Sequence, residues 1–129
     1  MAMARERTIT AHFTSSKKWF ENTLGSEYNY TAATGPYEYL LGALAGCYIS
    51  TLSSYPRKGT WESIEVKVTG NKRDETPSTL KTTKLDITVK GATDEAEFLA
   101  LADRAKAECS IFQTISKVSE MIVGVKFVS

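Results

Sequence analysis

The 129-residue sequence contains little of what most metal sites, secreted folds and membrane proteins need. It has two cysteines and a single histidine, His12, which are too few ligands for a structural zinc site. No hydrophobic stretch has the length and flanks of a bilayer span, and the first residues lack the apolar core of a signal peptide. The formal net charge of +1 indicates neither a nucleic-acid nor a membrane partner. We therefore expect a cytoplasmic protein with no metal or bound cofactor, in a compartment that keeps thiols reduced.

What the sequence does contain is an ordinary globular composition. Hydrophobic residues make up 42% of the chain and charged residues 24%, values typical of a globular domain. At this length we expect residues 1–129 to form one domain with its own core.

The longest stretch of apolar and small residues, 35–54, is predicted to be a helix. Pro36 suits the first helical position, because its missing N–H would have no partner there. Gly35 is then the N-cap, and Glu38 reaches the third position, where a carboxylate meets free N–H groups and the positive end of the helix dipole. Apolar residues lie on nearly every side, so we expect a central buried element.

The rest of the chain alternates between strand and helix patterns. An apolar/polar alternation from Trp61 to Thr69 and another from Thr79 to Lys90 predict an antiparallel hairpin. A helix capped by Thr93 or Asp94 follows, either continuous or broken near Cys109. Further strands are predicted at 8–15, 19–24 and 122–128, with a loop or short edge strand within 25–34. This order of elements is typical of a two-layer α+β fold.

Two segments resemble a known family. Residues 36–47, PYEYLLGALAGC, resemble the P-x-E-x-L-L-x-A-L-x-G-C helix of the OsmC/Ohr family, the osmotically inducible and organic hydroperoxide resistance proteins. Residues 107–116, AECSIFQTIS, resemble the second cysteine segment of that family. The resemblance implies an OsmC-like α+β fold with antiparallel sheets, central buried helices and an intertwined homodimer.

The resemblance also implies a thiol peroxidase that reduces organic hydroperoxides. Cys47 would attack the peroxide and become a sulfenic acid, and Cys109 would condense with it to a disulfide that an external dithiol reduces. In the peroxidase members an arginine from the N-terminal strands, held by a glutamate, keeps the first thiol ionised. Glu38 is the candidate glutamate, whereas the N-terminal strands offer Lys17 and Lys18 but no arginine.

Helix geometry places Glu38 and Cys47 apart. Nine residues at about 100° per residue put them on opposite faces, roughly 13 Å from each other. If both serve one site, Glu38 must come from the partner subunit, so activity would require the dimer.

Two alternatives to the peroxidase remain at this point. The same dimer could bind a small apolar ligand with silent cysteines. It could also be a redox sensor, in which the disulfide changes the stability of the dimer.

Overall fold

The computed structural model describes residues 5–129. The elements follow the order β-β-β-α-β-β-α-α-β, so the predicted α+β class is confirmed. Contacts divide the chain into two compact units, the first ending at Tyr39 and the second spanning Leu40–Ser129. The expectation of a single domain stays a prediction.

The first unit is an antiparallel sheet of three short strands in sequence order. Its strands are β1 (Ile9–Phe13), β2 (Lys18–Asn22) and β3 (Glu27–Asn29). The loop between β2 and β3 is closed by the Asn22 side chain, which accepts backbone N–H groups at 2.9 and 3.0 Å. Gly25 has φ 87° in this loop, a left-handed conformation that glycine adopts without strain. The short third strand lies where a loop or edge strand was predicted.

Aromatic side chains occupy both faces of this sheet. On one face Phe20 stacks on its cross-strand partner Tyr28, with ring centroids 4.9 Å apart. Tyr39 meets Phe20 edge-on at 5.3 Å on that face. On the other face His12 stacks on its partner Trp19 at 4.7 Å. Cross-strand pairs of this kind are the main source of stability in a small sheet.

Helix α1 (Pro36–Ser53) begins as the sequence predicts. The Gly35 N–H donates to Glu38 Oε1 at 2.7 Å, so the predicted capping interaction is confirmed. The prediction of an entirely buried helix is wrong for the single chain. One face is buried, through Leu44, Tyr48 and Leu52. On the opposite face the small residues Gly42, Ala43 and Gly46 are exposed.

The predicted hairpin forms the centre of the second unit. Strands β4 (Ser63–Lys72) and β5 (Leu80–Lys90) pair antiparallel, in register from Ser63↔Lys90 onward. Alternate β5 side chains are buried, which is the expected pattern for a strand with one face in the core.

The last strand corrects the expectation of antiparallel sheets. Strand β6 (Glu120–Val128) pairs with β5 in parallel, giving the order β4-β5-β6. The connection passes through α2 (Glu95–Glu108) and α3 (Ser110–Ser116). A helical crossover of this length returns the chain to its starting end, so the next strand runs parallel.

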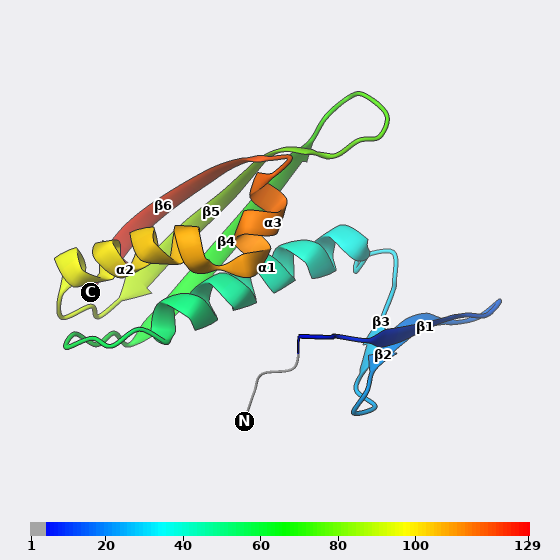
Figure 1. The fold of residues 1–129 in the computed structure, drawn as a ribbon, viewed down its shortest axis with the longest axis horizontal. Helices are drawn as coiled ribbons and strands as arrows, with labels where there is room; N and C mark the ends of the chain where they lie inside the picture. The colour runs from blue at the N-terminus through cyan, green and yellow to red at the C-terminus, as the bar shows by residue number, and fades with distance from the viewer. Residues whose placement is uncertain (1–4) are drawn as a thin grey trace. The chain divides into compact units, whose positions relative to one another are not determined.

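The three helices supply the second layer of this unit. Figure 1 shows α2, α3 and the part of α1 after Leu40 lying on one face of the sheet. The core between the layers is lined by buried side chains from strands and helices, among them Leu85, Ile87, Val89, Leu44, Tyr48, Phe98, Ala105 and Phe112.

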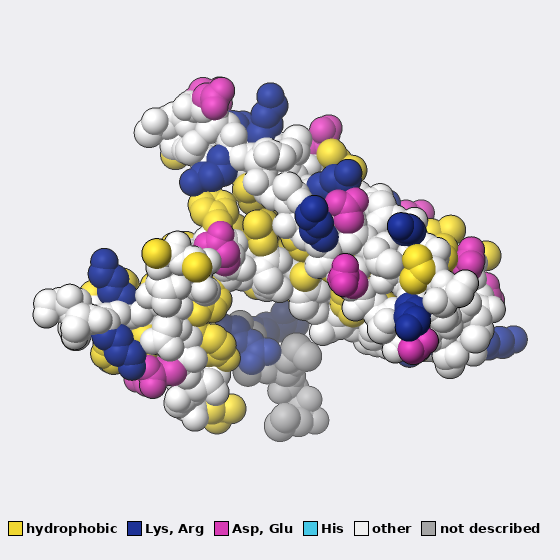
Figure 2. Space-filling model, turned by 180° about the vertical axis from the view of Figure 1, so that it is seen from behind, with side chains coloured by type: hydrophobic (Ala, Val, Ile, Leu, Met, Phe, Trp, Pro, Cys, Tyr) yellow, Lys and Arg dark blue, Asp and Glu magenta, His cyan; other side chains and the backbone are white. Residues whose placement is uncertain are grey.

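The surface carries charges of both signs. Figure 2 shows Lys and Arg side chains interspersed with Asp and Glu, in keeping with the net charge of +1. Within residues 5–129, no helix has both the length and the hydropathy to cross a bilayer.

Candidate active site

The two cysteines of the chain lie side by side in the second unit. Cys47 comes from the middle of α1, and Cys109 from the junction between α2 and α3. Their Sγ atoms are 3.1 Å apart, with the Cys109 thiol donating to the Cys47 sulfur. Both are free thiols. The sequence separates them by 62 positions, so only the packing of α1 against the α2–α3 junction brings them together.

The backbone at Cys109 explains how its side chain reaches α1. Cys109 has φ −73° and ψ 115°, an extended conformation that ends α2 and caps the start of α3. Its N–H still donates to Ala105 O at 2.8 Å, and its carbonyl accepts from Gln113 N–H at 3.0 Å. The sequence left open whether the helix is broken near Cys109, and the structure shows that the break is present.

The two sulfurs differ in exposure and in hydrogen bonding. Cys109 is fully buried, and its Sγ accepts the Phe112 N–H at 3.4 Å. Cys47 is half-buried, one position before the buried Tyr48. A small molecule can therefore reach the Cys47 sulfur more readily than the Cys109 sulfur.

The pKa values of the two thiols are shifted in opposite directions. Burial raises the pKa of Cys47, but hydrogen bonds from the Ile111 backbone and the Cys109 thiol, followed by the Ser110 and Thr51 side chains, bring it below its ordinary value. Burial and the neighbouring Cys47 raise the pKa of Cys109 above its ordinary value, despite the Phe112 N–H. Although α3 begins directly after Cys109, burial and the adjacent sulfur outweigh the effect of the backbone donor on the pKa of this thiol. Cys47 is thus the more readily ionised thiol.

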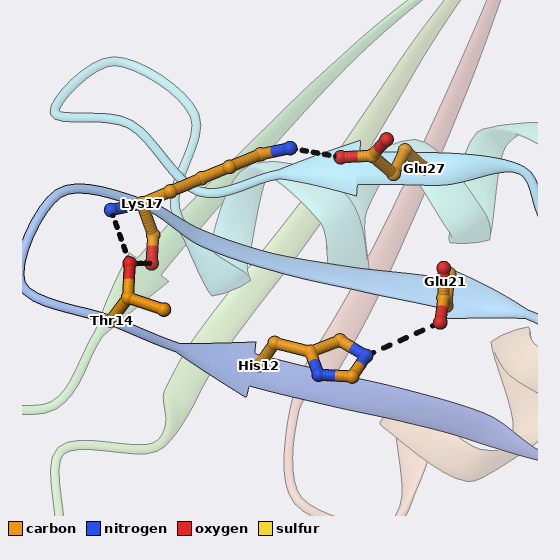
Figure 3. Close-up of polar contacts among 5 residues, drawn as sticks. All are labelled: His12, Thr14, Lys17, Glu21 and Glu27. Carbon is orange, nitrogen blue, oxygen red and sulfur yellow. Dashed lines mark hydrogen bonds and ion pairs between the residues drawn. The ribbon is translucent and has the colours of Figure 1, made fainter.

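The donors to Cys47 are neutral. Of the residues that the structure describes, those acting most strongly on this thiol offer backbone N–H, hydroxyl and thiol groups rather than lysine or arginine. In the first unit, Lys17 pairs with Glu27 and lies over the Trp19 ring at 4.4 Å from its centroid. Figure 3 shows the Lys17 and Glu27 side chains pointing toward one another. Lys18 lines an open pocket of the same unit.

Glu38 and His12 have partners of their own. The Glu38 carboxylate accepts the Gly35 N–H in the first turn of α1. His12 Nε2 lies 3.2 Å from Glu21 Oε1, also visible in Figure 3. The structure therefore brings Cys47 and Cys109 together and places Glu38 at the start of α1.

Sequence reasoning missed the polar contacts that α2 makes with α1, with the loop after α1 and within itself. The Tyr48 hydroxyl donates to Ala102 O at 2.7 Å inside the core. Burial is the main cause that raises the pKa of Tyr48 to about 12, so the hydroxyl keeps its proton at neutral pH. The Tyr55 hydroxyl donates to Glu108 Oε1 at 3.0 Å, and Arg104 Nε donates to Glu108 Oε2 at 3.2 Å. Only the four-residue spacing of Arg104 and Glu108 could have been read from the sequence.

Similarity to known proteins supports a family assignment. A family model described as OsmC-like protein matches residues 28–122. Comparison with curated protein sequences gives no match.

Solved structures share the fold at low sequence identity. An OsmC-like protein from Mycoplasma pneumoniae is 20% identical, with a TM-score of 0.83 over 98% of this chain and 100% of that one. An organic hydroperoxide resistance protein OsmC from Legionella pneumophila is 17% identical, with a TM-score of 0.69 over 97% and 99%. The organic hydroperoxide resistance protein OhrB of Bacillus subtilis is 17% identical, with a TM-score of 0.66 over 94% and 98%. Together with the family model, these matches show that the chain belongs to the OsmC-like protein family.

Proposed function

We propose that this protein is a thiol peroxidase that reduces organic hydroperoxides, with Cys47 as the attacking thiol and Cys109 as the resolving thiol. The observation that carries the proposal is the 3.1 Å separation of two free sulfurs, one half-buried and one fully buried. Two of the structural relatives bear the name organic hydroperoxide resistance protein, which supports the substrate class.

In the first step the Cys47 thiolate attacks the outer oxygen of a hydroperoxide ROOH. An S–O bond forms, the O–O bond breaks, and the alkoxide takes a proton from water to leave as the alcohol ROH. Sulfur is oxidised by two electrons to a sulfenic acid, and the peroxide is reduced by the same two. The lowered pKa of Cys47 raises the thiolate fraction available for this step at neutral pH.

In the second step the Cys109 sulfur attacks the sulfenic sulfur. The S–S bond forms, the S–O bond breaks, and the Cys109 proton leaves with the hydroxyl as water. A disulfide has an S–S length of about 2.0 Å, so the sulfurs must approach by roughly 1 Å from their reduced positions. An external dithiol then reduces the disulfide by thiol–disulfide exchange and is itself oxidised.

We further propose that the protein works as a cytoplasmic homodimer, with Glu38 supplied to the Cys47 site by the partner subunit. The exposed face of α1 supports this assembly, because a Cβ built on Gly42 or Gly46 meets no atom within 4 Å. Small residues on an apolar face permit a second helix to approach closely.

Thiol counting with cumene hydroperoxide tests the chemistry. We expect two thiols to be lost per wild-type chain and none in Cys47→Ser. In Cys109→Ser, a dimedone adduct should form on Cys47 and persist. Two thiols that survive excess peroxide in the folded wild type would contradict the peroxidase and favour the ligand-binding alternative.

Sedimentation tests the assembly. Gly46→Arg should give a monomer with little peroxidase activity, whereas Ala100→Arg, on the exposed face of α2, should remain dimeric and active. A fully active monomer would contradict the shared site.

A further inference from the structure

In the proposed reaction Cys47 acts as a thiolate, and groups of the second unit must stabilise its negative charge. A half-buried thiolate loses solvation, and hydrogen bonds or nearby cations must replace it. The donors that reach Cys47 come from two places. Thr51 lies one turn along α1, and the residues from Cys109 to Ile111 lie at the α2–α3 junction.

These donors are not equivalent. The Thr51 hydroxyl donates its only proton to the Cys47 carbonyl at 2.8 Å, so that proton is shared at best with the sulfur. The Cys109 sulfur accepts the Phe112 N–H at 3.4 Å on one side. Its own proton is directed to the Cys47 sulfur on the other side, at 3.1 Å. This orientation makes Cys109 a donor while Cys47 is the acceptor.

We propose that Cys109 is a catalytic hydrogen-bond donor to the Cys47 thiolate, so that it acts in the peroxide step before it acts as the resolving thiol. The inference rests on the proposed function and on the 3.1 Å contact between the two sulfurs. It assigns to Cys109 a role that precedes disulfide formation.

One proton then serves two steps. While Cys47 is a thiolate, the Cys109 proton is shared with it through the S–H···S⁻ hydrogen bond. After Cys47 has become a sulfenic acid, that proton leaves with the hydroxyl as water while the S–S bond forms. No oxidant beyond the hydroperoxide is required, and the two steps consume two protons and two electrons for each molecule of ROOH reduced.

Titration of Cys47 in single-thiol variants tests the proposal without peroxide. Cys109→Ser keeps an O–H donor, whereas Cys109→Ala removes it, and each leaves Cys47 as the only thiol. We expect the thiolate absorbance at 240 nm and the rate of iodoacetamide alkylation to rise with pH around the same midpoint. That midpoint should lie about one pH unit higher in Cys109→Ala than in Cys109→Ser.

Ser116→Ala, made in the Cys109→Ser background, is the control, because its hydroxyl donates to Gln113 O at 2.7 Å at the far end of α3. It should leave the midpoint unchanged.

Equal midpoints in Cys109→Ala and Cys109→Ser would overturn the proposal, even if Cys47 consumes peroxide. If the midpoints differ but the protein does not react with peroxide, the peroxidase is overturned and the donor role of Cys109 stands. If Cys109→Ala does not fold, Cys109→Val, which also lacks a donor, takes its place.

Discussion

The middle of α1 and the α2–α3 junction each present one cysteine, yet the two regions treat the sulfur differently. On α1, Cys47 lies in a regular helix, is half-buried, and receives hydrogen bonds from groups outside its own turn. At the junction, Cys109 lies in an extended residue between two helices, is fully buried, and donates to its neighbour. The difference indicates that backbone conformation and burial shift the pKa values of two identical side chains in opposite directions, with neutral groups of the described residues as the main donors.

Among the variants that test this comparison, replacing either cysteine should have the largest effect. Cys47→Ser should abolish peroxide consumption, whereas Cys109→Ser should complete one turnover and then stop as the sulfenic acid. A ferrous xylenol orange assay of remaining hydroperoxide, run under single and multiple turnover, separates the two results. Identical behaviour of the variants would remove the distinction between the two regions.

Truncating the buried face of α1 tests how the Cys47 region is held. Leu44→Ala removes a fully buried side chain one turn before Tyr48 and should lower the free energy of unfolding by about 2–5 kcal/mol. Leu40→Ala is the matched control on the same helix, because Leu40 is 38% exposed. Urea unfolding measures both. A cost for Leu40→Ala as large as for Leu44→Ala would mean that α1 is buried on both faces in solution.

Removing the hydroxyl of Tyr48 tests the link between the two regions. Tyr48→Phe removes the second hydrogen bond to the Ala102 carbonyl, which keeps its partner within α2, and should cost about 0.5–1.5 kcal/mol. The loosened α1–α2 contact should also slow disulfide formation after peroxide addition, measured by quenched-flow alkylation. An unchanged rate would indicate that the sulfurs are held together by apolar packing alone.

The smallest effect concerns the pH dependence of the contacts beside Cys109. The Tyr55 hydroxyl and then Arg104 hold the pKa of Glu108 below its usual value. A carboxyl with a depressed folded-state pKa contributes stability above its unfolded pKa and loses it as the pH falls through the folded pKa. Glu108→Gln should therefore lower the urea midpoint slightly at pH 7 and not at all at pH 3. An equal loss at both pH values would show that the carboxylate charge plays no part.

The local sequence pattern predicted where helices and strands lie, but it did not predict every strand pairing or how each helix is buried. The start of α1, its capping by Glu38 and the β4–β5 hairpin depend on neighbouring residues, and the structure confirms them. The parallel pairing of β6 depends on a crossover through two helices, which periodicity within the strand cannot show. The one-sided burial of α1 likewise depends on how many layers the chain itself supplies.

For the candidate site, the sequence predicted which residues take part but not their electrostatics. The family resemblance singled out Cys47, Cys109 and Glu38, and the structure brings the two sulfurs within 3.1 Å. The pKa of Cys109 could not be predicted, because it depends on burial and on a sulfur 62 positions away.

The closeness of the two sulfurs has a thermodynamic consequence for the proposed catalytic cycle. A bond between them would close a loop of about 60 residues and, through the lost chain entropy of the unfolded state, would make the oxidised protein more stable by about 4 kcal/mol. The same free energy would lower the reduction potential of the folded disulfide by about 85 mV relative to the unfolded chain. The proposed cycle therefore requires a strongly reducing dithiol, because reduction also removes the stability that the disulfide gives to the fold.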